Sequence, residues 1–344
     1  MAAAYRAARV DAELCASAAA VAIAEGLLCG VTTVADHHLT WPDGADHRAM
    51  AEATIATARQ LGGRLVFVRG TAGDDPETAA AECDELARVL AGQPDPMVQL
   101  AVGPAGVHSD GPEAFRLIGE VAARHGLRRR TQANEQVDVE RAAERYGRRP
   151  LELLEDWGWL APDVTLAHLC GVTDAEMDRM AAAGVSATHA PGCDLPSGWG
   201  VAPVAALARR GIAVGLGTSG GGSNDAGHLL ADARLAMQVA PLAGASLTAR
   251  DVLRMATSGS ATGLGRADLG HLEPGAAADL CCWDVSGAAD AGVADPLAGL
   301  VWASPGRRPR HVVVAGRVVV RDWALVTADE HVIADRLRAV MRGR

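Results

Sequence analysis

Apolar runs typical of strands alternate along most of the chain with the amphipathic pattern of helices. Seven such strands are expected, at Val31–Asp36, Arg64–Arg69, Met97–Val102, Leu127–Glu135, Val164–Leu169, Val185–His189 and Ile212–Gly217. The helices that follow them in turn are expected at Ala45–Leu61, Pro76–Leu90, Pro112–His125, Val137–Trp157, Asp174–Ala183, Val201–Arg210 and Asp225–Val239. This alternation predicts an α/β fold with a parallel sheet. One further helix, Val10–Leu28, has no strand before it, so we predict a (β/α)8 TIM-type barrel that lacks its first strand.

The pattern changes after a helix expected at Ala249–Thr257. A strand over Asp279–Val285 and a hairpin over His311–Val320 with a glycine-containing turn predict a small antiparallel unit. A last helix is expected from about Ala328. We therefore divide the chain into a barrel (1–262), a remnant of an accessory β-subdomain (263–326) and a C-terminal helix (327–344).

Composition excludes several classes of protein. The net charge is −10, and all 32 basic residues are arginine, so nucleic-acid binding and lysine-dependent Schiff-base or P-loop chemistry are not expected. No apolar run is long enough to span a membrane. The start, Met1–Arg6, leads into an amphipathic helix and does not have the pattern of a signal peptide. The 7 cysteines are scattered without CxxC spacing, as expected for reduced thiols in a cytoplasmic protein.

Polar residues gather where the expected strands end. In a barrel these ends line one cavity, and they carry His37 and His38, His108, Gln132 and Glu135, His168, His189, and Ser219. Each histidine alone is more often an ordinary loop residue, but together they favour a polar functional pocket. A zinc site needs three or four converging ligands, and no HxH or HExxH pair is present. The adjacent His37 and His38 face opposite sides of a strand, so at most one of them enters the pocket.

Glu135 is the candidate for proton transfer, because burial at a barrel mouth raises the pKa of a carboxylate toward neutrality. It could equally be a carboxylate that only favours the helix dipole. The glycine-rich turn Gly217–Asp225 could bind an anion, but it lacks the lysine of a nucleotide-binding loop.

From about Glu25 onward the chain resembles the amidohydrolase superfamily, in particular the 8-oxoguanine deaminase and hydroxyatrazine ethylaminohydrolase group. The segments that carry the resemblance are Gly30–His38, Ala167–His168, His189–Pro191, Gly215–Gly217 with Ser223–Asp225, and Leu264–Leu280. The resemblance implies a barrel in which one Zn²⁺ or Fe²⁺ ion activates water to hydrolyse a C–N bond of a heterocycle. The implied ligands are an HxH pair on the first strand, a His three residues before a catalytic Glu, and an Asp after the eighth strand.

This chain departs from that pattern at the ligand positions. The HxH strand is absent, Gln132 stands for the implied His, and Ser219 stands for the implied Asp. Glu135 and His168 remain as the expected catalytic residues. Expected substrate-binding residues are His108, Gln132, His189, Asp194, Ser219 and Asn224, where Asp194 replaces the usual Asn. No metal site is expected, with His168 and His38 as residual candidate ligands. We therefore expect no cofactor, or Zn or Fe if the site was rebuilt.

The absence of the first strand would have no biological meaning if the start codon were wrongly chosen. If it is real, two strand edges are left unpaired. We expect the N-terminal segment, a loop, a second copy of the chain or a partner subunit to cover them.

Three functions stay open from the sequence. The first is a C–N hydrolase for a purine-, pyrimidine- or triazine-like ring with a remodelled, metal-poor site. The second is a metal-free enzyme in which Glu135 and His168 catalyse proton transfer or cyclisation on a related heterocycle. The third is a non-catalytic relative that binds a ligand or a partner subunit. Metal binding lowers the pKa of water from ~15.7 to ~7, whereas one general base supplies about 10²- to 10⁴-fold, so the usual chemistry should not survive loss of the metal unchanged.

Overall fold

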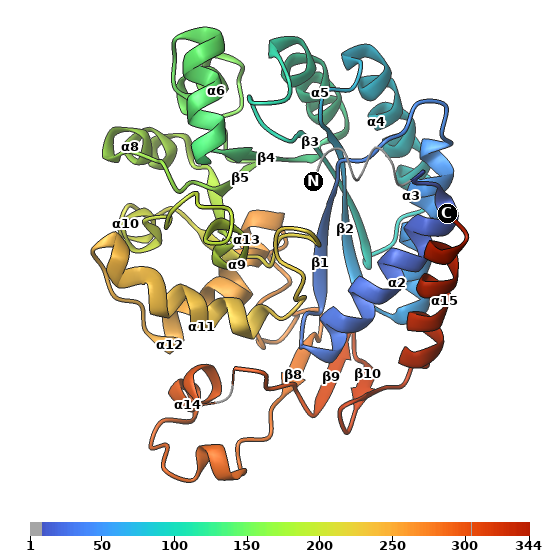
Figure 1. The fold of residues 1–344 in the computed structure, drawn as a ribbon, viewed down its shortest axis with the longest axis vertical. Helices are drawn as coiled ribbons and strands as arrows, with labels where there is room; N and C mark the ends of the chain where they lie inside the picture. The colour runs from blue at the N-terminus through green and yellow to red at the C-terminus, as the bar shows by residue number, and fades with distance from the viewer. Residues whose placement is uncertain (1–8, 304) are drawn as a thin grey trace.

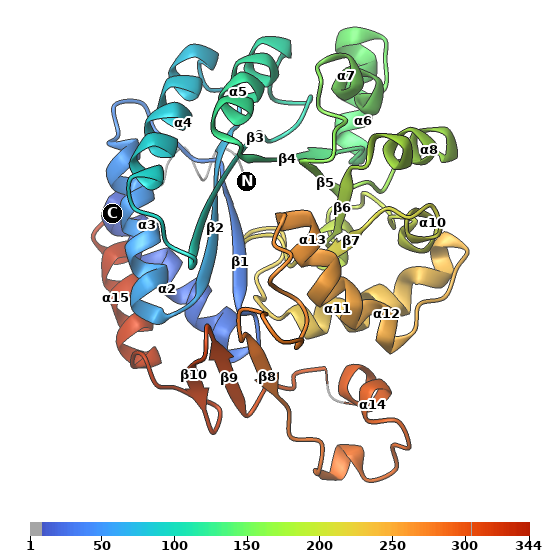
Figure 2. The ribbon, with the colours of Figure 1, turned by 180° about the vertical axis from the view of Figure 1, so that it is seen from behind.

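Seven parallel strands curl into a half-barrel of the (β/α) TIM type, with helices on the outside (Figures 1 and 2). The computed structural model describes residues 9–303 and 305–344, so the predicted start at Met1–Arg6 lies outside the described residues. The strands are β1 (Thr33–His38), β2 (Arg64–Thr71), β3 (Val98–Pro104), β4 (Arg128–Ala133), β5 (Val164–His168), β6 (Ser186–His189) and β7 (Val214–Leu216). They pair in chain order, so β1 and β7 form the two edges of the sheet. That another segment or subunit covers these edges stays a prediction.

The helices alternate with the strands as the sequence predicts. They are α2 (Ala12–Leu28), α3 (His47–Leu61), α4 (Pro76–Ala91), α5 (Pro112–His125), α6 (Gln136–Tyr146), α7 (Pro150–Asp156), α8 (Asp174–Ala183), α9 (Pro191–Asp194), α10 (Val204–Arg209) and α11 (Leu229–Val239), with a short 3₁₀ helix, η1, at Ala240–Ala243. The predicted stretch Val137–Trp157 is two helices, because Gly147 ends α6 with a φ of 64° and Pro150 begins α7. The one-turn helix α9 was not predicted.

The two faces of the strands pack against different layers. Leu65 and Phe67 of β2 belong to the core between the sheet and its outer helices. Val66 and Val68 face the other way and pack inside the barrel with Ala101 of β3. Because both faces of these strands are buried, their sequences are continuous apolar runs, and this pattern allowed the strands to be predicted.

The C-terminal part adds a four-stranded antiparallel sheet. The predicted helix at Ala249–Thr257 continues as α12 (Ala249–Arg254), a π-helical turn η2 (Met255–Gly259) and α13 (Ser260–Leu264). The sheet contains β8 (Leu280–Cys282), β9 (His311–Val314), β10 (Arg317–Arg321) and β11 (Ala324–Leu325), in the order β11-β10-β9-β8. Between β8 and β9 lie η3 (Ala288–Asp290) and α14 (Pro296–Trp302), which were not predicted.

The last helix, α15 (Glu330–Arg342), lies alongside α2 in both views (Figures 1 and 2). Arg344 Nη2 binds Asp11 Oδ1 at 2.6 Å, which ties the two helices at their ends. The antiparallel sheet is joined to the barrel by a buried ion pair, in which Arg64 Nη2 lies 2.8 Å from Asp279 Oδ1. The division at residues 262 and 326 stays a prediction.

Two further features follow from the described residues. All seven cysteines are unpaired, as the scattered pattern predicted. Within residues 9–303 and 305–344, no helix combines the length and the apolar character that a membrane crossing would require.

Candidate active site

Glu135 lies buried just beyond the C-terminal end of β4, with 2% of its surface exposed. Gln132 is the last but one residue of β4. In the amide orientation that satisfies both its polar atoms, its nitrogen donates to Glu135 Oε1 at 3.2 Å and to the carbonyl of Ala105 at 3.3 Å. Burial raises the pKa of Glu135, and the charges of His168 and His108 only partly oppose that rise. Glu135 is also the N-cap residue of α6, but its side chain makes no capping hydrogen bond. The carboxylate therefore faces the site and does not serve the helix end.

A buried polar network holds the turn that carries Glu135. Asp138 is fully buried and accepts hydrogen bonds from the backbone N–H groups of Asn134 at 2.9 Å and His108 at 3.2 Å. The ring of His108 lies 3.3 Å from the same carboxylate. Burial alone would lower the pKa of His108, but the hydrogen bond and charge of Asp138 outweigh it, so the pKa is raised. His108 thus contacts this supporting network, and the sequence analysis missed Asp138.

His168 ends β5 and connects Glu135 to Asp194. Its Nε2 lies 3.4 Å from Glu135 Oε1, and its Nδ1 lies 2.6 Å from Asp194 Oδ1. The backbone at His168 and Leu169 has φ angles of 73° and 61°. Left-handed conformations are strained for bulky residues and are found most often at functional sites. The predicted catalytic pair is therefore brought together by the fold, with Asp194 behind the imidazole.

His189 and Cys193 complete the buried wall of the site. His189 Nδ1 lies 3.6 Å from Asp194 Oδ2. Burial lowers the pKa of His189 to about 4 in spite of the charge of Asp194. His168, Cys193 and Asp194 are the group in the described part of the chain that could hold a metal ion, because one donor atom of each lies within 4.8 Å of the others. The sequence analysis treated Cys193 only as one of the scattered reduced thiols. Its closeness to His168, at the end of another strand, is seen only in the structure.

Asn224 and Ser219 lie farther along the rim. Asn224 Nδ2 donates to Asp232 Oδ2 at 3.2 Å, and Asp232 accepts the N–H of Gly192 at 2.9 Å. Asn224 is therefore linked to the turn that carries Cys193 and Asp194. Ser219 is an exposed loop residue whose hydroxyl lies 3.2 Å from that of Ser223. Among the hydrogen bonds of the described residues, none joins Ser219 to Glu135 or His168.

Trp199 is a candidate contact for a ligand that the sequence analysis missed. Its indole meets the ring of His168 edge to face, with ring centroids 5.2 Å apart and an interplanar angle of 82°. Aromatic side chains beside a polar cluster commonly form one wall of a pocket for a flat ligand. The feature of the sequence that could have pointed to Trp199 is a tryptophan within a loop rich in glycine and proline.

His37 and His38 face opposite sides of β1, as their adjacency predicts. His37 shares the inner face with Ala35 and donates to the carbonyl of Gly103 at 2.9 Å. His38 stacks on Phe67 of the outer core, and its Nε2 donates to the carbonyl of Thr40 at 3.2 Å. The structure therefore does not bring His38, a residual candidate ligand, to Glu135 and His168.

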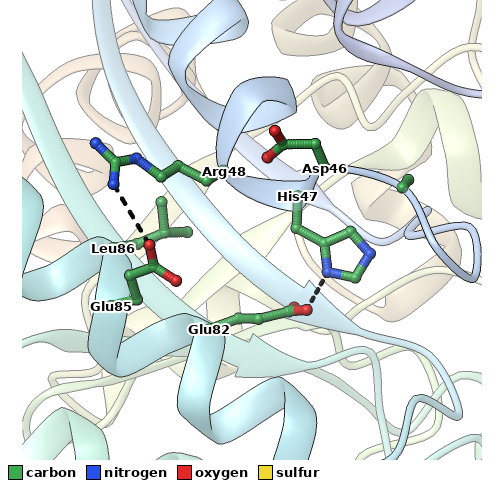
Figure 3. A pocket seen from close by; sticks show the side chains of 7 residues that line it. Asp46, His47, Arg48, Glu82, Glu85 and Leu86 are labelled. Carbon is green, nitrogen blue, oxygen red and sulfur yellow. Dashed lines mark hydrogen bonds and ion pairs between the residues drawn. The ribbon is translucent and has the colours of Figure 1, made fainter.

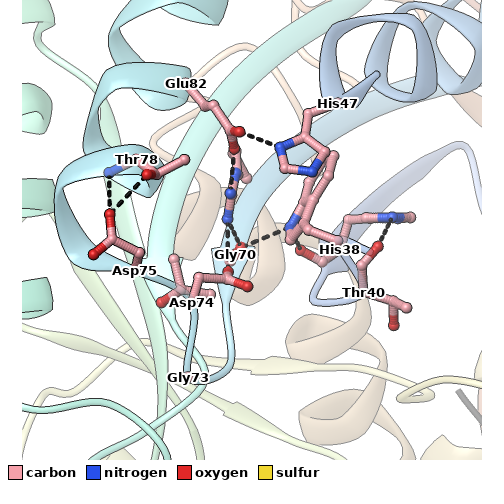
Figure 4. Close-up of polar contacts among 12 residues, drawn as sticks. His38, Thr40, His47, Gly70, Gly73, Asp74, Asp75, Thr78 and Glu82 are labelled. Carbon is pink, nitrogen blue, oxygen red and sulfur yellow. Dashed lines mark hydrogen bonds and ion pairs between the residues drawn. The ribbon is translucent and has the colours of Figure 1, made fainter. Parts of the chain in front are cut away.

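A second polar cluster lies near His38, on the outer side of β2. The guanidinium of Arg69 is 1% exposed, ion-pairs with Glu82 and Asp74, and stacks over Trp41. Figure 4 shows Glu82 pointing toward His47. Glu82 also contacts His47 at the edge of a pocket of about 250 Å³ between α3 and α4 (Figure 3). Two carboxylates balance the charge of this buried guanidinium, and the indole ring packs against its face. We therefore interpret the cluster as one that stabilises the fold.

A half-barrel with polar residues at the C-terminal ends of its strands is typical of the (β/α) barrels, which carry their functional sites at that face. The chain belongs to the amidohydrolase family, whose model matches residues 3–319. It is 34% identical over 350 residues to an 8-oxoguanine deaminase from Pseudomonas aeruginosa, covering 96% of this chain and 77% of that protein. It is 29% identical to a 5-methylthioadenosine/S-adenosylhomocysteine deaminase from Syntrophobacter fumaroxidans, covering 94% and 73%.

Solved structures of related enzymes also match this chain over nearly its whole length. An atrazine chlorohydrolase variant from Arthrobacter aurescens, complexed with zinc and atraton, matches with a TM-score of 0.91 and 36% identity, covering 99% of this chain and 79% of that one. A zinc-bound adenosine deaminase from Xanthomonas campestris matches with a TM-score of 0.91 and 25% identity, covering 99% and 78%. The expectation that no cofactor takes part is not supported, since these neighbours bind zinc and the chain contains a group of residues that could hold a metal ion.

The residues at the metal positions implied by the family resemblance do not fit an ion. The amide of Gln132 is used between Glu135 and Ala105. Ser219 offers a neutral hydroxyl on an exposed loop. A neutral amide and a neutral hydroxyl, engaged in separate contacts, are poor substitutes for the nitrogen and carboxylate ligands that zinc prefers.

Proposed function

We propose that this chain hydrolyses a C–N bond of a small nitrogen heterocycle of the purine, pyrimidine or triazine type. The names of the deaminase relatives support cleavage of a C–N bond. The atrazine chlorohydrolase, complexed with atraton, supports a triazine-like ring but not the bond that is cleaved. The proposal assigns the chemistry to Glu135 and His168. Asp194 positions His168, and Trp199 offers an aromatic wall to the flat ring.

Glu135 is the proton carrier in this proposal. Burial raises its pKa above that of an exposed glutamate, which makes the carboxyl group better suited to both accept and donate a proton during the reaction. As carboxylate it takes a proton from a water molecule that attacks the ring carbon, and as acid it returns that proton to the departing nitrogen. The attacking oxygen forms the new C–O bond as the C–N bond breaks, so ammonia or an amine leaves.

One observation carries the proposal, namely the buried line of contacts from Glu135 through His168 to Asp194. The two links measure 3.4 Å and 2.6 Å. A histidine oriented by a carboxylate on one nitrogen can donate or accept a proton at the other. The strained backbone at His168 and Leu169 supports selection for this placement, since strain of order 1–3 kcal/mol per residue persists mainly at functional sites.

The test is turnover by the wild type and by Glu135→Gln, with release of ammonia or amine measured on 8-oxoguanine, 5-methylthioadenosine and atraton. We expect wild-type turnover of one of these classes and a loss of kcat/KM of at least about 100-fold in E135Q. Glu113→Gln, an exposed carboxylate on α5 with 56% of its side chain accessible, is the matched control and should be unaffected. Equal turnover in E135Q and wild type would refute the assignment.

A second candidate is a metal-independent proton transfer or cyclisation on a related heterocycle. The observation that favours it is the hydrogen bond from Gln132 to Glu135 at 3.2 Å, at the position where the family resemblance implies a metal ligand. Mass spectrometry in H₂¹⁸O separates the two candidates. Hydrolysis places one ¹⁸O atom in the product, whereas proton transfer or cyclisation places none. A ligand that binds without turnover would instead favour a non-catalytic role.

A further inference from the structure

Three buried side chains at the ends of β5 and β6 combine the donor types that zinc prefers. His168 ends β5, while Cys193 and Asp194 lie in the one-turn helix α9 after β6. Their exposed fractions are 4%, 2% and 0%. An imidazole, a thiol and a carboxylate are the three ligand types of protein zinc sites, and the thiol selects against Mg²⁺ and Ca²⁺.

The spacing of these side chains is close to that of a tetrahedral site. One donor atom from each residue lies within 4.8 Å of the donor atoms of the other two. Zinc bond lengths of about 2.0–2.3 Å place neighbouring ligands about 3.3–3.6 Å apart. His168 Nδ1 and Asp194 Oδ1 are closer, at 2.6 Å. An ion would thus open this hydrogen bond by less than about 1 Å, and the 4.8 Å limit on the other donor distances means that the sulfur would move by no more than about 1.5 Å.

Unsatisfied polar atoms around the group are an independent observation. Asp194 Oδ2 and both ring nitrogens of His189 are buried, and none of them has a hydrogen-bond partner among residues 9–303 and 305–344. His189 is only 2% exposed, and its Nδ1 lies 3.6 Å from Asp194 Oδ2. Buried polar atoms are nearly always hydrogen-bonded or bound to an ion. Their concentration around one carboxylate indicates a ligand that binds between them.

We propose that His168, Cys193 and Asp194 bind a zinc-class divalent ion beside the buried ring of His189. This site differs from the one implied by the family resemblance, because it uses none of the positions occupied by Gln132 and Ser219. It also assigns a role to Cys193. The inference does not rest on the proposed activity, since binding is measured without substrate.

Binding of the ion at His168 Nδ1 has a consequence for the neighbouring carboxylate. The proton that Nδ1 shares with Asp194 must leave, so the neutral ring carries its proton on Nε2. Nε2 lies 3.4 Å from Glu135 Oε1. A bound ion would therefore keep the proton of His168 on Nε2, the nitrogen that faces Glu135.

The test is zinc binding by the full-length chain, measured by mass spectrometry of the metal after loading and buffer exchange, together with a competition titration. We expect about one ion per chain in the wild type. Cys193→Ser and Asp194→Asn should bind at least about 100-fold more weakly, because loss of a mere supporting contact already costs 10- to 100-fold. Zinc should raise the melting temperature of the wild type and not that of these variants.

Two kinds of control test the assignment. Cys170→Ser removes another thiol near Asp194 that lies outside the trio, and it should retain the ion. Gln132→Ala and Ser219→Ala should also retain it. A wild type without bound metal, or metal retained by C193S, would overturn the proposal, as would loss of the ion from Q132A or S219A.

Should C193S or D194N fail to fold, cobalt binding to the wild type decides the question. A thiolate ligand gives Co²⁺ a sulfur-to-metal charge-transfer absorption in the near ultraviolet, with tetrahedral bands in the visible. The expected result is both features at one cobalt per chain. Cobalt bound without the sulfur band would overturn the role of Cys193.

Discussion

Asp232 is a buried carboxyl group on α11 whose ionisation should destabilise the fold. Only 4% of the residue is exposed, and its oxygens accept hydrogen bonds from Gly192 and Asn224. Burial raises the pKa of Asp232 from 3.8 to about 6, and the charge of Asp194 acts in the same direction. The two hydrogen bonds lower the pKa but do not offset the burial.

The sign and size of the effect follow from proton linkage. Because the folded pKa lies above the unfolded one, the stability due to this group is fully present below about pH 4 and is lost as the pH rises through about 6. A pKa difference between 3.8 and about 6, at ~1.36 kcal/mol per pH unit, corresponds to about 3 kcal/mol. About 1.3 kcal/mol of this loss falls between pH 5 and pH 7.

Urea unfolding of the wild type and Asp232→Asn at pH 5, 6 and 7 measures this loss. The variant carries a neutral amide, so its free energy of unfolding relative to the wild type should rise by about 1.3 kcal/mol across this range. Asp251→Asn is the control, because hydrogen bonds from Thr248 lower the pKa of Asp251 and it is ionised throughout. Its difference from the wild type should stay constant. A D232N difference that changed by less than about 0.3 kcal/mol would refute the reasoning.

Two further predictions concern stability. Asp279→Ala should lower the free energy of unfolding by about 3–5 kcal/mol in urea titrations, because Arg64, 2% exposed, would keep a buried charge without its carboxylate. Asp322→Ala, which breaks an exposed ion pair with Arg310, should cost no more than about 1 kcal/mol, and equal costs would contradict the argument. Gly103→Ala should abolish folding or lower the melting temperature sharply, since a Cβ there would lie 1.6 Å from the carbonyl oxygen of Arg130; a melting temperature like that of the wild type would count against the packing of β3 on β4.

Most of the fold could be predicted from the sequence because parallel strands buried on both faces are continuous apolar runs. Arg64–Arg69 is one example, and β2 extends it by two residues. The short helix α14 was missed, since seven residues give little periodicity to detect. The break after Tyr146 was missed because Gly147 is tolerated inside many helical patterns, and its left-handed φ of 64° is known only from the structure.

The site could be predicted only in part. The sequence singled out Glu135 but left open whether it serves the helix end, which the missing capping bond and the contact to His168 now address. Cys193 could not be distinguished from the other buried thiols, because its neighbours come from a different strand. Asp138 and Trp199 were missed for the same reason. Such contacts between the ends of neighbouring strands depend on how the strands pair in the sheet and leave no periodic pattern in the chain.

The core around β2 has a consequence for how the protein is made. Val312, Val314, Val319 and Val320 of the C-terminal hairpin pack in the same buried cluster as Phe67 and the residues of α2 and α3. A ribosome releases the first βα units long before it has synthesised this hairpin, so their outer apolar surface emerges without its final partner. The first half of the barrel must then wait, exposed to aggregation and to chaperones, until the end of the chain arrives. Such contacts between distant segments also slow folding, so completion of this core should be a late, post-translational event.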